Sequence, residues 1–152
     1  MSDSTSSTDH SGHVDQALRL RWPVAIAIVL FTISYPANDF YGAESDTDIG
    51  LGLFLGYVAI AVATAITVFS VVMPWAIHRQ RVGAVALTLS VVGFLLAPGF
   101  WTGVPPAVAA GGALLGWAGV DAARGRRLSQ AALVIGVLAV IANVYSYAIV
   151  FV

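Results

Sequence analysis

The stretch from Val82 to Val120, VGAVALTLSVVGFLLAPGFWTGVPPAVAAGGALLGWAGV, decides the fold, because it is apolar and carries no charged residue. A helix needs about 20 apolar residues to cross a bilayer core of about 30 Å, so this stretch is too long for one crossing. Its middle, from Ala97 to Pro106, is rich in proline and glycine, which end helices. The stretch therefore predicts two apolar helices joined by a tight turn. The alternative is a re-entrant pair that does not cross fully.

Three further charge-free runs flank this hairpin, at 22–38, 49–77 and 128–152. Together they predict an all-α, integral membrane helical bundle with five transmembrane helices, at about 20–38, 51–77, 82–101, 104–122 and 128–151. Pro23 suits the first turn of the first helix, and Pro36 suits its end. The transmembrane domain then covers residues 18–152.

Residues 1–17, MSDSTSSTDHSGHVDQA, differ from the rest of the chain in being polar and nearly free of apolar side chains. Such a segment cannot bury enough surface to order itself, so it predicts a disordered cytoplasmic tail. His10 and His13 lie in this segment, where we expect solvated side chains rather than metal ligands.

The composition indicates a membrane protein and excludes several kinds of function. Hydrophobic residues make up 59% of the chain and charged residues 10%, with a mean hydropathy of +0.87. Average soluble domains are about 25% charged. The chain has no cysteine, which excludes disulfides and thiolate chemistry. Its net charge of −1 argues against a nucleic-acid partner.

The basic side chains predict how the chain is oriented in the membrane. All seven are arginines, namely Arg19, Arg21, Arg79, Arg81, Arg124, Arg126 and Arg127. With five crossings every arginine falls on one side. The charged side chains of the loop between the first two helices are, by contrast, all acidic. Basic residues of short loops stay in the cytoplasm, so we expect a cytoplasmic N-terminus and an extracytoplasmic C-terminus in the plasma membrane. Arg79, Arg81, Arg124, Arg126 and Arg127 are expected to contact anionic lipid headgroups.

Small residues recur at intervals of three and four in the predicted helices, and such residues let helices approach closely in lipid. The candidate packing residues are Gly52, Gly56, Gly83, Ser90, Gly93, Gly112, Gly116, Gly119, Gly136 and Asn143. They predict either a compact bundle or a homo-oligomer. Pro74 removes one helical hydrogen bond and is a candidate hinge, although a static kink is the commoner outcome.

No predicted helix has an ionisable residue near its middle, so we expect no catalytic residue, no cofactor site and no metal site. His78 lies at the cytoplasmic boundary. Asn143 is the deepest polar residue, and we expect it to bond a neighbouring helix rather than a substrate. The acidic segment 44–50 alternates carboxylates as a calcium loop does, but it lacks the turn glycine, and a solvated loop is expected.

The region from Val82 to Asn143, about two-fifths of the chain, resembles a membrane domain of unknown function that is widespread in actinobacteria. The matching residues are Ala86, Ser90, Gly93, Pro105, Pro106, Gly111, Leu115, Gly116, Gly125, Arg126, Ala132 and Gly136. The family has more basic residues after its middle helix, where this chain has Asp121-Ala122-Ala123. The resemblance implies a bacterial plasma-membrane helical hairpin with no assigned activity.

These features predict a multi-pass plasma-membrane protein that is not an enzyme. The expected role is a structural or accessory subunit that packs through small-residue seams against a second copy or another membrane protein. The alternative is a small channel or permease for neutral or apolar solutes, which the uncharged helices and Pro74 also fit.

Overall fold

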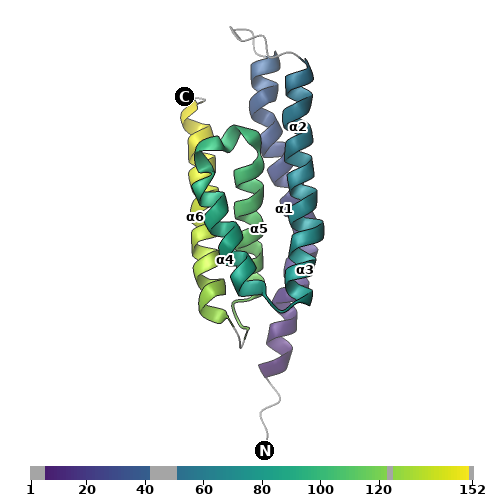
Figure 1. The fold of residues 1–152 in the computed structure, drawn as a ribbon, viewed down its shortest axis with the longest axis vertical. Coiled ribbons are helices and arrows are strands. Elements are labelled where there is room, and N and C mark those ends of the chain that lie inside the picture. The colour runs from purple at the N-terminus through teal and green to yellow at the C-terminus, as the bar shows by residue number, and fades with distance from the viewer. Residues whose placement is uncertain (1–5, 42–50, 123–124, 151–152) are drawn as a thin grey trace, which may run out of the picture.

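The computed structural model describes residues 6–41, 51–122 and 125–150, and every regular element in these residues is a helix. In chain order the elements are α1 (Ser6–Tyr41), α2 (Leu51–Ile66), the π-helix η1 (Thr67–Val72), α3 (Met73–His78), α4 (Val82–Leu95), the 3-10 helix η2 (Ala97–Thr102), α5 (Val104–Ala118) and α6 (Arg126–Val150). Because α2, η1 and α3 follow one another as a single rod, the described residues form five rods that alternate in direction (Figure 1). The all-helical prediction is confirmed.

Three of these rods are long and apolar enough to cross a membrane, over Gly12–Ser34, Gly52–His78 and Arg126–Ile149. In the most apolar 18-residue window of each, only 17%, 22% and 28% of the residues are buried inside the protein. Side chains such as Leu30 and Leu138 therefore point outward, with exposures of 64% and 53%. So much exposed apolar surface along whole helices is typical of a protein that is surrounded by lipid.

The hairpin α4–η2–α5 is shorter than the sequence predicts. Helix α4 ends at Leu95 and α5 at Ala118, whereas the predicted spans reach 101 and 122. At 1.5 Å per residue, helices of 14 and 15 residues are about 21 and 22 Å long, which is less than a bilayer core of about 30 Å. The 3-10 helix takes up the residues before Gly103, and the turn of the hairpin lies below the upper ends of α1 and α2 in Figure 1.

Helix α1 begins at Ser6, so the prediction that residues 1–17 are disordered is wrong for residues 6–17. The reason is that Val14 and Ala17 continue the inward face of α1 and pack against the core, with Ala17 fully buried. Pro23 accordingly lies inside a helix and not in its first turn. The first turns of α1 project beyond the other helices at the N-terminal end of the bundle (Figure 1).

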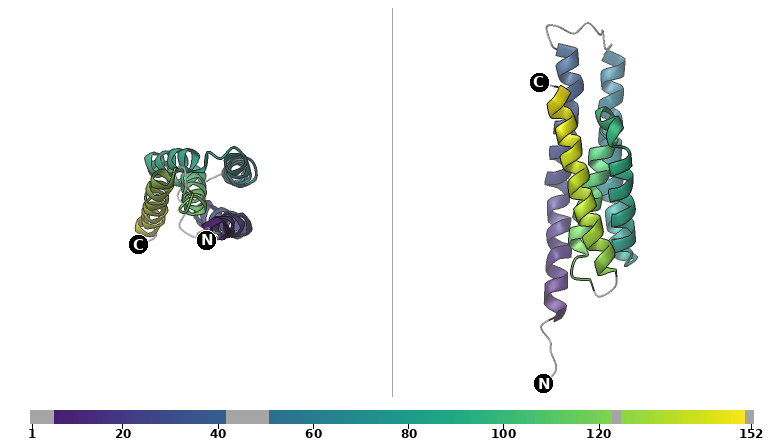
Figure 2. Two further views of the ribbon diagram at one scale, coloured as in Figure 1. Left: turned by 90° about the horizontal axis from the view of Figure 1, so that it is seen from below. Right: turned by 90° about the vertical axis from the view of Figure 1, so that its left-hand side faces the viewer.

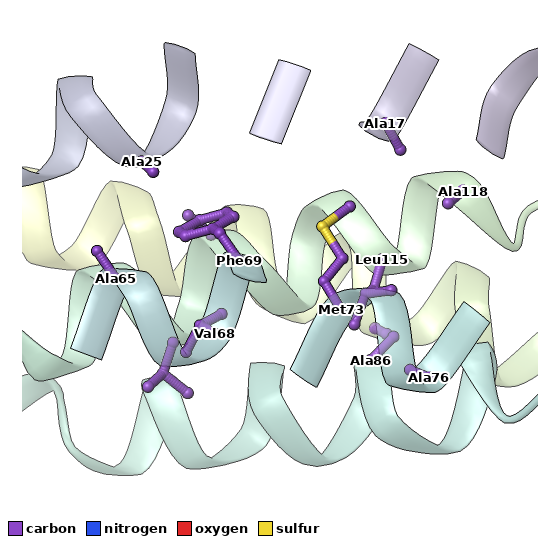
Figure 3. Packing of buried hydrophobic residues seen from close by; sticks show 13 residues of the cluster. Ala17, Ala25, Ala65, Val68, Phe69, Met73, Ala76, Ala86, Leu115 and Ala118 are labelled. Atoms are coloured by element: carbon purple, nitrogen blue, oxygen red, sulfur yellow. The ribbon is translucent and has the colours of Figure 1, made fainter. Parts of the chain in front are cut away.

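Helix α5 occupies the middle of the bundle, where it contacts α1, α2, α4 and α6 (Figure 2). Most of its residues are buried, which requires small side chains because helices press on it from several directions. The largest buried apolar side chains are Phe69, Met73 and Leu115. They fill the space between α5, the η1–α3 segment and two alanines of α1, Ala17 and Ala25 (Figure 3).

Candidate functional site

The three helices α4, α5 and α6 pack through glycines that admit no side chain. A Cβ added to Gly93 would lie 2.6 Å from the backbone nitrogen of Ala109, and one added to Gly136 would lie 2.8 Å from that of Ala113. Gly116 is equally close, since its added Cβ would lie 2.7 Å from the nitrogen of Leu133. These backbones therefore touch directly, as predicted for a small-residue seam.

Serines complete this seam. The hydroxyl of Ser90 on α4 is fully buried and donates a hydrogen bond of 2.7 Å to the carbonyl oxygen of Ala132 on α6. Gly112 faces Ser90, and Gly119 faces Ser129 near the start of α6. Gly83 begins the seam, because a Cβ there would lie 2.8 Å from the carbonyl oxygen of Gly125. Eight of the ten predicted packing residues thus lie inside this bundle, with Asn143 discussed below.

The other two predicted packing residues, Gly52 and Gly56, do not pack within the chain. A Cβ added to either would meet nothing within 4 Å among the described residues. Both lie on α2, where Ala59 and Ala63 continue the same face at helical spacing and are exposed. We call these four residues the α2 small-residue stripe. Among the described residues no helix packs on these two glycines, so of the two predicted arrangements only a contact with another chain is left for them.

Asn143 is fully buried on α6, but it does not bond a neighbouring helix as predicted. Its side-chain nitrogen donates a hydrogen bond of 2.7 Å to the carbonyl oxygen of Ala139, one turn earlier in the same helix. Its Oδ1 is buried and has no hydrogen-bond partner among the described residues. The local bond is available to any helical asparagine, which is why sequence spacing alone could not decide between the two arrangements.

Pro74 lies just after the π-helix η1, whereas the sequence predicts a hinge or a static kink at this position. The N–H of Met73 donates to the carbonyl oxygen of Val68, five residues earlier, and this wide turn ends just before the proline. A proline has no N–H and crowds the preceding turn, and widening that turn relieves the crowding. The predicted hinge position is therefore a local widening inside one continuous rod, as Figure 1 shows for α2 to α3.

The described arginines gather at one end of the bundle, because the α3–α4 link, the start of α6 and the first half of α1 all lie there (Figure 1). Arg79, Arg81, Arg126 and Arg127 are exposed there, and their contact with lipid headgroups stays a prediction. Arg124 lies outside the described residues. We call this end the arginine end.

His13 joins the first turns of α1 to the arginine end of α5. Its Nε2 lies 3.0 Å from a carboxylate oxygen of Asp121. Its ring packs in a T-shaped arrangement with the ring of Trp117, and the two ring centroids are 5.5 Å apart. Both ion-pair side chains are about one-third exposed, at 35% and 37%. The sequence predicts a solvated His13, and this prediction is wrong, because the helix continues back far enough to place the ring over α5.

Replacing His13 with alanine should loosen the start of α1 without unfolding the bundle. A half-exposed ion pair and one aromatic contact together contribute on the order of 1 kcal/mol, so amide hydrogen exchange around residues 12–17 should become roughly five-fold faster. Hydrogen exchange read by mass spectrometry in detergent measures this. Gln16→Ala, at an exposed neighbouring position, is the control and should leave the exchange unchanged. Equal exchange in the His13→Ala and parent proteins would contradict the contact.

Arg21, one of the arginines that the sequence predicts on the cytoplasmic side, is partly buried on α1. It lies four residues from both Ala17 and Ala25, the two buried alanines of α1 that lie near Phe69 and Met73 in Figure 3. The side chain is partly buried, and its Nε is buried with no hydrogen-bond partner among the described residues. Its guanidinium carbon lies 5.7 Å from the ring centroid of Trp22.

The remaining candidate sites from the sequence are His78, a metal site and the acidic segment 44–50. His78 is exposed at the end of α3, and no group of three metal-ligating side chains occurs in the described part of the chain. The acidic segment 44–50 lies outside the described residues. The main polar features of the described bundle are thus the arginine end, with Arg21 and His13, and the isolated Asn143. Comparisons with protein-family models, with curated proteins and with solved structures found no match.

Proposed function

We propose that this chain is a five-pass plasma-membrane protein with a cytoplasmic N-terminus, which acts as a non-enzymatic structural or accessory subunit. In this proposal the bundle packs against a second copy of itself or against another membrane protein. Anionic lipid headgroups neutralise the arginine end. The membrane domain that the region from Val82 to Asn143 resembles is consistent with this proposal, because it implies a helical hairpin without an assigned activity.

The observation that carries the proposal is the α2 small-residue stripe. The seam among α4, α5 and α6 is already occupied within the chain, whereas a Cβ added to Gly52 or Gly56 would meet no described residue within 4 Å, and Ala59 and Ala63 are exposed. In lipid, a stripe of small residues lets a second helix approach closely enough for van der Waals contact and weak Cα–H hydrogen bonds. An uncovered stripe therefore favours an intermolecular helix contact.

The orientation is supported by the arginine end and does not depend on how deeply the short hairpin enters the membrane. The hairpin α4–η2–α5 starts and finishes at the arginine end, so it adds either two crossings or none. The two chain ends fall on opposite sides in both cases. The excess of arginine at one end then favours a cytoplasmic location for that end.

Crosslinking in native membranes tests the proposed packing. A cysteine at Ala59 should form a crosslinked species with a second copy or a partner of defined mass, because this residue lies at the centre of the stripe. Adding Gly56→Leu should reduce that species several-fold, since a large side chain blocks close approach. Ala131→Leu, an exposed small residue on α6, is the matched control and should have no effect. A crosslinking pattern that shows only the lone monomer would refute the proposal.

A further inference from the structure

An apolar groove runs between α1 and α2 on the outside of the bundle, with a volume of about 230 Å³. Helix α1 contributes Trp22, Ile26 and Leu30 to its wall, and α2 contributes Val62, Ala65 and Ile66. On α1 the groove extends from Trp22 to Leu30, nine residues that span about 12 Å of helix. Half of a bilayer core is about 15 Å, so the groove is about as long as the chain region of one lipid leaflet.

The end of this groove nearest the arginine end is marked by Trp22 and Arg21. Trp22 lines the groove, and the guanidinium carbon of Arg21 lies 5.7 Å from its ring centroid. The groove therefore begins beside a positive charge, at the level where an indole ring prefers the boundary between chains and headgroups.

Arg21 lacks the partner that a partly buried guanidinium needs. Its Nε is buried without an acceptor, and the ion pair found in the described residues joins His13 to Asp121 instead. Asp15 on the same helix is exposed and makes no ion pair with it among the described residues. The guanidinium as a whole is only partly buried and lies beside Trp22, so it can donate to an anion at this end of the groove.

We propose that the α1–α2 groove binds one acyl chain of an anionic phospholipid and that Arg21 binds its phosphate. The apolar walls accept the chain, Trp22 lies at the level of the ester groups, and the guanidinium of Arg21 donates hydrogen bonds to the phosphate oxygens. Arginine suits this role because its planar fork donates to two phosphate oxygens at once. This site does not require a partner protein and does not depend on what the α2 small-residue stripe binds.

A second groove of the same molecule provides an internal comparison. It lies between α1, α5 and α6, has a larger volume of about 330 Å³, and includes Val24, Leu114, Trp117 and Val137 in its wall. Its tryptophan is next to His13, which is paired with the carboxylate of Asp121. Because an acidic side chain stands at this end, the second groove should accept acyl chains without favouring an anionic headgroup.

Fluorescence quenching by brominated lipids tests the site in the full-length protein. With Trp75, Trp101 and Trp117 changed to phenylalanine, Trp22 is the single reporter beside the groove. In vesicles that mix brominated-chain phosphatidylglycerol with phosphatidylcholine, the relative binding constant at Trp22 should favour phosphatidylglycerol about five-fold, the factor expected for one arginine beside an anionic lipid. Arg21→Gln should lower this ratio to near one, and Arg21→Lys should keep part of it.

Arg19→Gln is the matched control, because Arg19 carries the same charge two residues away and is exposed. The ratio should stay near the parent value in this variant. A second reporter protein with Trp117 alone should show a ratio near one. Equal loss in Arg19→Gln and Arg21→Gln would show that general surface charge attracts the lipid and would overturn the proposed site. A ratio near one in the parent protein would overturn it as well.

Discussion

Gly93→Ala and Gly136→Ala should each destabilise the protein by about 1–3 kcal/mol, the usual cost of forcing extra methyl groups into a packed core. In both cases the new Cβ would lie within 3 Å of the backbone of a neighbouring helix, at Ala109 or at Ala113. Backbone atoms cannot rotate out of the way as a flexible side chain can. Helices must therefore move apart, which loses van der Waals contact along the seam.

The unfolding free energy, measured by titrating the detergent-solubilised protein with a denaturing detergent, reports this loss. Gly12→Ala is the matched control, because the same methyl group is added on α1 where nothing lies within 4 Å among the described residues. Alanine is the better helix former, so this control should be unchanged or slightly stabilised. If all three variants lost the same stability, the glycines would not act through the seam.

Single cysteines at the two ends of the bundle should be labelled from opposite sides of the membrane. The parent chain has no cysteine, so any label reports the introduced residue. In intact cells an impermeant maleimide should label Ser45→Cys, whereas Gly12→Cys should react only after the cells are permeabilised. Gly12 is exposed and has open space around it, so the cysteine causes no clash. Labelling of both positions in intact cells would refute the proposed orientation.

A third cysteine, at Gly99 in the turn of the hairpin, separates a complete crossing from a re-entrant pair. A Cβ at Gly99 meets nothing within 4 Å. Labelling of Gly99→Cys from outside supports five crossings. Protection from the reagent, in both intact and permeabilised cells, would instead place the turn inside the lipid and reduce the number of crossings to three. The labelling of Gly12→Cys and Ser45→Cys should be the same in either case, because the hairpin changes the number of crossings by two.

The sequence predicted the helical fold well where the pattern was long and uniform. The rod from Gly52 to His78 and helix α6 agree closely with the predicted spans, since charge-free runs of this length have few other stable arrangements in lipid. The ends of helices were predicted less well. α1 starts at Ser6 and α4 stops at Leu95, because these limits depend on what each helix end contacts and not on its hydropathy.

The candidate sites also include features that the sequence predicted and features that only the structure shows. Hydropathy by itself indicated that this chain is a membrane protein. Small-residue spacing by itself identified Gly93, Gly112 and Gly136 as residues for close helix packing. Only the tertiary structure decided that Gly52 and Gly56 meet no other described residue, that His13 reaches Asp121, and that the guanidinium of Arg21 lies beside Trp22. The physical reason is that spacing along a helix fixes which residues share a face, whereas the direction in which that face points depends on how the other four rods pack around α5.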